Sequence, residues 1–259
     1  MSHRCPSILL DKRGARIAHV ASVSHDFQHR EVIPDHLHPE DQLVFASNGV
    51  MTVHTTDGIF VVPPLRAVWI PAGTAHSIAM SGAVSLRTLY FAPKLVQRFP
   101  STCVVLNVSP LLKELVLHAC QFPRMRKERV THRRIIELII DQMKTARAIP
   151  LQLPQPRDPR AMRIAAALIG DPSQQETLQQ LCQDCGASKR TAERLFVAET
   201  KMSLASWRQR LRLLHALRLL AAGEKVARAA MESGYKSTSA FIAMFRKQLG
   251  VTPALYFKA

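Results

Sequence analysis

The chain has 259 residues, enough for two domains, and its hydrophobic content of 47% allows well-packed cores. No segment has the ~18 uninterrupted apolar residues of a membrane span, and residues 1–20 lack the long apolar core of a secretory signal. The five cysteines are an odd number in a chain without such a signal. Composition therefore argues against a membrane protein and against a disulfide-bonded secreted domain. It predicts a cytoplasmic protein with reduced thiols.

The positive charge is confined to one part of the chain. Lys and Arg number 35 against 19 Asp and Glu, which gives a formal net charge of +16. Residues 1–93 are neutral, with 7 basic and 7 acidic residues, whereas residues 94–154 carry +7 and residues 155–259 carry +9. Taken alone, such charge is most often a solvated surface. Its restriction to one part of the chain favours a polyanionic partner, such as nucleic acid, that contacts that part.

Short apolar runs separated by turn residues fill the region from about 42 to 91. The runs LVFA, MTVHT, IFVV and AVWI end at Ser47-Asn48-Gly49, Thr56-Asp57-Gly58, Pro63-Pro64 and Pro71-Ala72-Gly73. Asn-Gly and Asp-Gly between alternating runs are strong hairpin signals. Strands this short and closely spaced predict a jelly roll or barrel. We therefore expect residues 1–93 to form a β-barrel whose inward-pointing polar side chains line a cavity.

The spacing of the histidines in this region is specific. His36 and His38 are followed by Gln42, and a second segment, residues 71–76, ends at His76. This arrangement resembles the two signature motifs of the cupin superfamily, whose fold is a small β-barrel. In metal-binding cupins the first motif supplies two His and a Glu, and the second supplies one His. Carried over by position, the resemblance implies the three histidines and Gln42 as candidate ligands, with Gln42 where the metal-binding pattern has Glu.

Three interpretations of these residues are open. His36, His38 and His76 could hold a divalent metal such as Zn, Fe or Ni, although an amide ligates cations less well than a carboxylate. In the interpretation that we favour, these histidines bind a small-molecule effector in a metal-free pocket, together with Gln42 and Trp69. In the third, the first two histidines simply pair with nearby carboxylates. The carboxylates are Asp35, Glu40 and Asp41, and the aromatic residues that would either stack on a ligand or form plain core are Phe45, Phe60, Trp69, Tyr90 and Phe91.

The middle of the chain predicts two amphipathic helices and a linker. Ser109-Pro110 is a typical helix start, and apolar residues follow it at helical spacing. A second helix with apolar residues between 135 and 143 follows a basic connection. We expect residues 94–148 to pack on the barrel or to pair with a second subunit, so this segment is a candidate for dimerisation in a homodimer. Four prolines within residues 149–159 then predict a semi-rigid interdomain linker.

Residues 160–259 contain two copies of one design. Residues 178–200 and 226–250 each predict an apolar-periodic helix, a turn glycine and a serine that caps a second helix. The turn glycines are Gly186 and Gly234, 48 residues apart, and the serines are Ser188 and Ser237, 49 residues apart. A helix-turn-helix presents its second helix to the DNA major groove in this way. Because a basic helix over residues 203–222 joins the copies, we expect two halves of one DNA reader.

The second helix of each copy carries the side chains that we expect to contact DNA. On the first, the candidates are Lys189, Arg190, Glu193 and Arg194, and the last three share one face. Arg reads guanine bidentately and Glu accepts from cytosine N4, each pair giving about 1–3 kcal/mol of discrimination. Glu193 could equally orient a neighbouring arginine. On the second helix the outward candidates are Thr238, Ser239, Ile242, Ala243 and Arg246. These mostly small side chains predict a close fit to the groove, with phosphate contact from Arg246.

Residues 178–256 resemble the DNA-binding domain of the AraC/XylS family of transcription regulators. The matching residues are Leu178, Leu181, Gly186, Ser188, Arg194, Phe196, Leu213, the segment ALRLL at 216–220, Ala227, Ala230, Gly234, Tyr235, Ser237, Phe241, Phe245, Gly250, Pro253 and Tyr256. The resemblance implies two recognition helices one DNA turn, ~34 Å, apart. It also implies a cupin-like pocket that senses a small molecule and changes transcription. Cys182 and Cys185 match buried family positions, so core packing explains this pair better than zinc or redox sensing.

We therefore predict an α+β multidomain regulator rather than an enzyme. It would bind double-stranded promoter DNA in a sequence-specific way, respond to a small-molecule effector, and contact RNA polymerase if it is an activator. Activation and repression are both compatible with the sequence. The alternative function is a metal-dependent, dioxygenase-like cupin enzyme with an accessory DNA-binding domain. Gln42 in place of Glu counts against that alternative, and the paired helix-turn-helix pattern counts more strongly against it.

Overall fold

The computed structural model describes residues 3–11 and 13–257, and these form two compact units. The first unit ends at Gln152, and the second begins at Leu153 and also includes the short segment Asp57–Ile59. The helices that we expected within residues 94–148 belong to the same unit as the strands. The first unit is therefore larger than the predicted barrel of residues 1–93.

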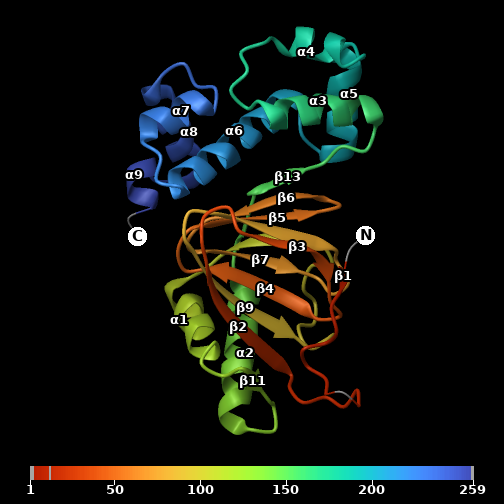
Figure 1. Cartoon of the computed structure of the whole chain (residues 1–259), viewed down its shortest axis with the longest axis vertical. Helices are drawn as coiled ribbons and strands as arrows, with labels where there is room; N and C mark the ends of the chain where they lie inside the picture. Colours follow the sequence, from red (N-terminus) through yellow and green to blue (C-terminus); the bar gives the residue numbers. More distant parts are fainter. Residues whose placement is uncertain (1–2, 12, 258–259) are drawn as a thin grey trace. The chain divides into compact units, whose positions relative to one another are not determined.

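The described strands of the first unit form two sheets (Figure 1). One has the order β1-β3-β8-β5-β6-β13 and the other the order β11-β2-β9-β4-β7-β10-β12. The strands are β1 His3–Arg4, β2 Val20–Phe27, β3 Val32–Leu37, β4 Asp41–Ala46, β5 Val50–Thr55, β6 Gly58–Val62, β7 Arg66–Ile70, β8 His76–Ser81, β9 Val84–Phe91, β10 Val104–Asn107, β11 Arg124–Met125, β12 Ala148–Ile149 and β13 Gln152–Pro154. The pairings of the described residues leave both sheets open, so the strand-rich, jelly-roll-like unit is present without a closed barrel.

Of the two predicted hairpins, one forms and the other does not. Strands β5 and β6, joined at Asp57-Gly58, are neighbours in one sheet, as expected. Strands β4 and β5 lie in different sheets, so the prediction of a hairpin at Asn48-Gly49 is wrong. Gly49 has a φ of +74°, and a Cβ on it would lie 2.4 Å from the carbonyl oxygen of Ala83. A glycine is needed there because the crossing segment approaches another turn closely, not because of hairpin geometry.

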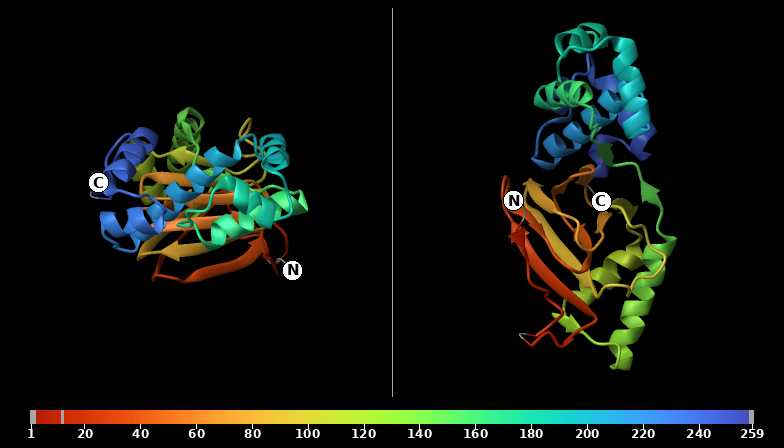
Figure 2. Two further views of the ribbon diagram at one scale, coloured as in Figure 1. Left: turned by 90° about the horizontal axis from the view of Figure 1, so that it is seen from above. Right: turned by 90° about the vertical axis from the view of Figure 1, so that its right-hand side faces the viewer.

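Two helices pack on the strands of the first unit. They are α1, Pro110–Ala119, and α2, Val130–Thr145, and the right-hand view of Figure 2 shows α2 running beside the strands. The Ser109 hydroxyl accepts a hydrogen bond from the Leu112 amide, which confirms the predicted start of α1. Their apolar faces share one core with the second sheet, including Leu43, Phe45, Ala67, Trp69, Leu89, Phe91, Leu112, Val116, Ile136 and Ile139. The inner faces of α1 and α2 therefore pack on the second sheet.

The segment predicted as a linker contains two short strands. Strand β12 pairs with β10, and β13 lies beside β6 at the end of its sheet. The four prolines do exclude a helix before Pro159, but they are compatible with strands at a sheet edge, where a missing N–H breaks no ladder. The first half of the predicted semi-rigid linker, residues 149–159, thus contains strand pairing that the prolines did not predict, and the boundary between the two units falls within it.

The second unit is helical apart from its first residues. Its helices are α3 Pro159–Gly170, α4 Leu178–Asp184, α5 Lys189–Thr200, α6 Leu204–Ala221, α7 Val226–Glu232, α8 Thr238–Leu249 and α9 Pro253–Tyr256. Side chains of Asp158, Thr177, Ser188, Ser203 and Ser237 accept hydrogen bonds from first-turn amides and fix where α3, α4, α5, α6 and α8 begin. Within the described part of the chain, no helix combines the length and the hydropathy needed to cross a bilayer.

Candidate functional site

The first helix-turn-helix consists of α4, a tight turn and α5. Gly186 occupies the left-handed region with a φ of +75°, and the Ala187 amide donates to the Cys182 carbonyl at 2.9 Å to close the turn. Arg163 donates twice to the carbonyl of Cys185, at 3.1 and 3.0 Å, and thereby ties the turn to α3. Phe196 on the inner face of α5 packs on Trp207 with ring centroids 5.4 Å apart. These contacts hold α5 rigidly with its opposite face outward.

The outward face of α5 is cationic. The side chains of Lys189, Arg190 and Arg194 are exposed, and none of them makes a hydrogen bond or ion pair with another described residue. Glu193 behaves differently, because its Oε2 accepts a hydrogen bond from the Leu204 amide at 3.1 Å. That amide begins α6, so Glu193 joins the two helices. One oxygen of its carboxylate is therefore committed to α6, a structural role that the sequence did not suggest.

The second helix-turn-helix consists of α7, a turn and α8. Gly234 has a φ of +77°, and the Ser237 hydroxyl accepts from the Ala240 amide at 3.2 Å. Phe241 and Phe245 are fully buried, as predicted. The predicted contact residues lie on the other side of the helix: Ser239, Ala243 and Arg246 are exposed, and Thr238 and Ile242 are half-buried.

Arginines of α6 hold the two copies together. The residues that make this helix basic are Arg208, Arg210, Arg212 and Arg218, and burial lowers the pKa of all four. Arg212 donates to the carbonyls of Pro172 and Gln174 at 3.0 and 2.9 Å, and Arg208 donates to the carbonyls of Glu176 and Gln174. These carbonyls lie in the loop before α4. The two arginines therefore anchor the first copy to the helix that leads to the second.

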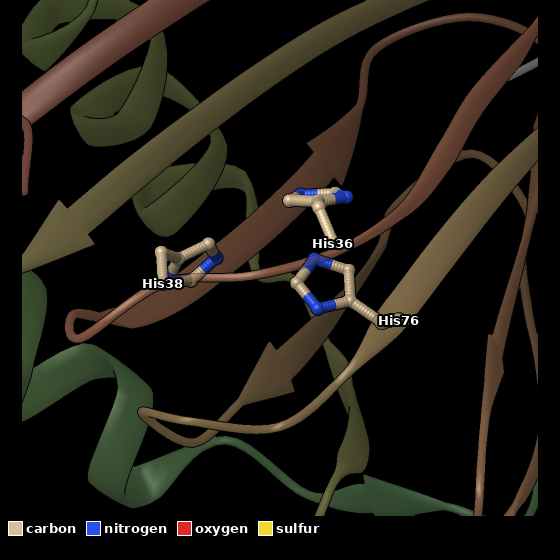
Figure 3. Close-up of side chains that lie close together, drawn as sticks. All are labelled: His36, His38 and His76. Atoms are coloured by element: carbon tan, nitrogen blue, oxygen red, sulfur yellow. The ribbon is translucent and has the colours of Figure 1, made fainter. Parts of the chain in front are cut away.

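In the first unit, the structure brings together the three histidines singled out by their spacing (Figure 3). His36 and His76 are register partners on β3 and β8, and His38 follows β3 two residues later on the same side. The ring centroids lie 4.2 Å apart for His36 and His76, and 5.3 Å apart for His38 and His76. One ring nitrogen of each lies within 4.8 Å of the others. His76 is fully buried, and burial lowers its pKa to about 4.

Gln42 joins this cluster through a directed chain of hydrogen bonds. Its Oε1 lies 3.1 Å from His38 Nε2, and its Nε2 donates to Thr88 Oγ1 at 3.0 Å. The Thr88 hydroxyl in turn donates to the Leu43 carbonyl at 3.1 Å. All of Gln42 except 2% of its surface is buried, so its amide is held against His38 and is shielded from solvent.

A pocket of about 460 Å³ opens beside the cluster. Its lining combines His36, His38, Glu40 and Tyr90 with an apolar wall from the N-terminal segment and β3: Cys5, Pro6, Ile8, Ile33 and Pro34. Burial raises the pKa of Tyr90 to about 12, so its hydroxyl is a neutral donor at ordinary pH. The N-terminal part of this wall was missed at the sequence level because it carries neither a motif nor a periodic pattern.

Trp69 does not belong to this pocket. It is 2% exposed, lies in the core between the second sheet and the helices, and donates from its indole to the Pro100 carbonyl at 3.1 Å. Phe45 and Phe91 lie in the same core. Side chains alternate between the two faces of a strand, so residues 42, 88 and 90 point away from these aromatic neighbours. The expectation that Trp69 binds an effector is therefore wrong, whereas Tyr90 lines the pocket.

Comparisons with known proteins agree with this two-part organisation. Residues 22–205, most of the chain, match the model of the AraC-like ligand binding domain, and residues 181–259 match that of a helix-turn-helix domain. The chain is 35% identical over 223 residues to the HTH-type transcriptional regulator NimR of Escherichia coli, covering 86% of this chain and 81% of that protein. It is 24% identical over 248 residues to the HTH-type transcriptional activator RhaR of Mannheimia succiniciproducens, with 86% of each covered.

Solved structures are also similar. The DNA-binding domain of AdpA, crystallised with a target DNA, is 31% identical, with 39% of this chain and 92% of that chain covered and a TM-score of 0.37. The matches to regulators leave no support for the enzyme alternative. The extent of the ligand-binding match and the identity to NimR establish that this chain belongs to the AraC family of DNA-binding transcriptional regulators, with an AraC-like ligand-binding domain followed by a helix-turn-helix domain.

Proposed function

We propose that α5 and α8 enter successive major grooves of a promoter, with α5 supplying most of the base recognition. The observation that carries this assignment is the uncommitted cationic face of α5, because Arg190 and Arg194 are exposed and have no partner among the described residues. An arginine with a free guanidinium on a rigid helix can bind guanine bidentately. The smaller outward residues of α8, Ser239 and Ala243, support a closer approach to the groove, and Arg246 and Lys189 supply phosphate contacts.

Substituting Arg194 tests this division directly. Arg194→Ala should weaken binding to the selected promoter site by about 1–3 kcal/mol, or roughly 5- to 150-fold, and leave non-specific binding nearly unchanged. Affinity for both DNAs is measured by fluorescence anisotropy at one fixed salt concentration.

The matched control is Arg228→Ala. It removes the same charge from the same unit, but Arg228 on α7 is already paired with Glu224 and Glu232 at 3.3 and 2.6 Å. An equal loss on specific and non-specific DNA for Arg194→Ala would reject base recognition and leave only a phosphate contact.

The pocket beside the histidine cluster is the proposed effector site. A volume of about 460 Å³ suits a small organic molecule, and the apolar wall with a few polar groups is typical of such sites. A small-molecule screen by thermal shift on the full chain identifies candidates, since a ligand that binds only the folded state raises the melting temperature. Ile33→Trp should fill the pocket and abolish the shift. A shift that survives this change would place the effector elsewhere.

A homodimer formed through the outer faces of α1 and α2 is a further part of the proposal. Leu111 on α1 is 49% exposed and Leu138 on α2 is 41% exposed, which gives each helix an apolar side chain on its solvent face. Leu111→Glu with Leu138→Glu should convert a dimer to a monomer in sedimentation analysis, and an unchanged mass would reject this interface. We place the regulator in the cytoplasm with its promoter, and RNA polymerase is its further partner if the output is activation.

A further inference from the structure

The pocket proposed as the effector site contains a buried carboxylate group. Glu40 is among the residues that line this pocket, and it is only 1% exposed. The Ser7 hydroxyl donates to Oε1 of this carboxylate, whereas Oε2 has no hydrogen-bond partner among the described residues. His38 Nδ1 lies 3.9 Å from Oε2, too far for a hydrogen bond, and donates instead to the Glu40 carbonyl oxygen at 2.9 Å. An unpaired carboxylate oxygen in a buried position is costly, so Oε2 is a place where a bound molecule can donate.

The charge around this carboxylate is negative. Residues 31–65, which include strands β3 to β6, contain five acidic residues and no Lys or Arg. Among the described residues that line the pocket, Asp35 and Glu40 carry carboxylates and none is Lys or Arg. An anionic molecule would therefore meet two carboxylates without a Lys or Arg to pair with, and like charges placed together are unfavourable. The lining counts against carboxylate and phosphate effectors and favours a positively charged one.

The rest of the lining indicates the body of the ligand. Pro6, Ile8, Ile33 and Pro34 form an apolar wall, and Tyr90 adds an aromatic ring. The Tyr90 hydroxyl makes no hydrogen bond with another described residue. An apolar wall suits a hydrocarbon or aromatic body, and a tyrosine ring attracts organic cations over its face. The volume of about 460 Å³ lies in the lower half of the roughly 300–1,000 Å³ range of small-molecule sites, so the molecule is compact.

We propose that the effector is an organic cation, a compact apolar or aromatic molecule whose protonated nitrogen donates to Oε2 of Glu40. An amine or amidine of this kind would satisfy the open oxygen, pair opposite charges in a place shielded from water, and lay its body on the apolar wall. A hydrogen bond between a charged N–H group and a carboxylate is stronger than one between neutral groups. The proposal rests on the assignment of this pocket as the effector site, and it adds the chemical class that the site selects.

Probes of matched shape and different charge provide the test. Benzamidine is a cation, benzamide its neutral counterpart and benzoate its anionic counterpart. Cyclohexylamine, cyclohexanol and cyclohexanecarboxylate form a second set without an aromatic ring. Each probe is titrated into the full chain at one salt concentration while the melting temperature is recorded, since a ligand of the folded state raises it. A chelator is present throughout, so that no metal ion joins a probe to the histidines.

We expect the cation of at least one set to raise the melting temperature in a saturable way. Its neutral and anionic counterparts should bind at least ~10-fold more weakly, because they lack the charged donor. Equal or tighter binding of the neutral or anionic counterparts would overturn the proposal. So would the lack of a saturable shift with every probe.

Substituting Glu40 tests where the cation binds. Glu40→Gln keeps the size of the side chain and removes its charge, so the cation should bind ~10-fold or more weakly and its neutral counterpart nearly as before. The matched control is Glu128→Gln, which removes the same charge from the same unit at a side chain that is 70% exposed and belongs to a different part of the surface. An equal loss in both variants would assign the preference to the overall charge and overturn the role of Glu40.

Circular dichroism checks that the Glu40→Gln chain folds. If it does not fold, the comparison of the three charges on the unaltered chain still decides the class. Ile33→Trp, which fills the pocket, then decides the place, because it should abolish the shift caused by the cation. A cation shift that survives in the Ile33→Trp chain would overturn the proposal.

Failure of this proposal can be told apart from failure of the proposed function. If Ile33→Trp abolishes binding of a neutral or anionic effector found in the screen, the pocket stands as the effector site and only the cationic class is rejected. If every stabilising molecule binds the Ile33→Trp chain as well as the unaltered chain, the pocket itself is rejected. Specific DNA binding, measured on the same preparations, is independent of both results.

Discussion

The two helix-turn-helix copies share a backbone design but differ in what surrounds it. Each has a left-handed glycine in the turn and a serine cap on the second helix. A Cβ on Gly186 would lie 3.3 Å from the nearest atom, Nη2 of Arg163, whereas a Cβ on Gly234 would lie 2.6 Å from Nη2 of Arg212. The second turn is therefore packed against the helix that connects the copies, while the first turn is tied to α3 by Arg163. Two turns with the same sequence pattern can therefore differ in how tightly the rest of the fold packs against them.

Substituting the two glycines tests this difference between the turns with the largest expected effect. Gly186→Ala should destabilise the chain by about 1–2 kcal/mol, the cost of a side chain in the left-handed region. Gly234→Ala should cost roughly 3 kcal/mol, because Arg212 must also give up hydrogen bonds to Pro172 and Gln174. Urea unfolding measures both. Equal losses would show that Arg212 moves aside freely and that the two turns are equivalent.

Acid should destabilise the chain through a half-buried histidine on the connecting helix α6. Burial lowers the pKa of His215 on α6 to about 4, below the ordinary value of 6.5. The unfolded chain then binds the proton more readily, so stability from this group is complete above pH 6.5 and is lost as the pH falls toward 4. We expect the free energy of unfolding to fall by about 2 kcal/mol over that window. Urea unfolding at a series of pH values measures this loss. His215→Gln should flatten the profile, and an unchanged profile would assign the loss to other groups.

Unlike the turn glycines, the two serine caps should contribute equally to the stability of the two copies. Ser188→Ala and Ser237→Ala each remove one hydrogen bond to a first-turn amide. Each should cost ~1 kcal/mol of unfolding free energy. Replacement of either serine by Asp retains an acceptor and serves as the control. A difference of more than about 1 kcal/mol between the two alanine variants would contradict equivalent capping.

The smallest expected effect concerns the salt dependence of DNA binding. Arg246 lies near the C-terminal end of α8, where we assign it to phosphate, so Arg246→Ala should lower the slope of log affinity against log salt by about 1 on every DNA. Arg194→Ala on α5 should instead act mainly on the selected site. Titrations at several salt concentrations compare them. If Arg246→Ala instead lost affinity only for some DNA sequences, base recognition would be assigned to the second copy as well.

Local signals predicted the helices of the second unit well. Ser188, Thr177 and Asp158 are N-caps in the structure because capping depends on a few adjacent residues. Apolar periodicity likewise identified the buried faces of α5 and α8. The same local reasoning did not foresee that Glu193 accepts from an amide on the next helix. Nor did it foresee that Arg208 and Arg212 of α6 donate to carbonyls in a loop more than 30 residues earlier.

The strand-rich unit was harder to predict for a related reason. Asn48-Gly49 is a good hairpin signal, but strand pairing is a long-range choice, and β4 pairs with β7 and β9 rather than with β5. Trp69 was predicted to face the pocket but lies in the core between the second sheet and the helices. A strand that is apolar throughout does not show which of its faces points to the pocket. Spacing alone did bring His36, His38 and His76 to attention, and the structure places them in one cluster.

By itself the sequence determined the family-level organisation: strands with a histidine pattern, then two capped helix pairs joined by a basic helix. These features follow from periodicity, turn residues and caps, which act over a few residues. Only the tertiary structure decided which charged groups are free and which are committed. Among the described residues the Arg194 side chain makes no hydrogen bond or ion pair, whereas Arg212 donates to two carbonyls, and Gln42 presents its amide oxygen to His38. Such differences depend on atoms brought together from distant parts of the chain, and no local pattern encodes them.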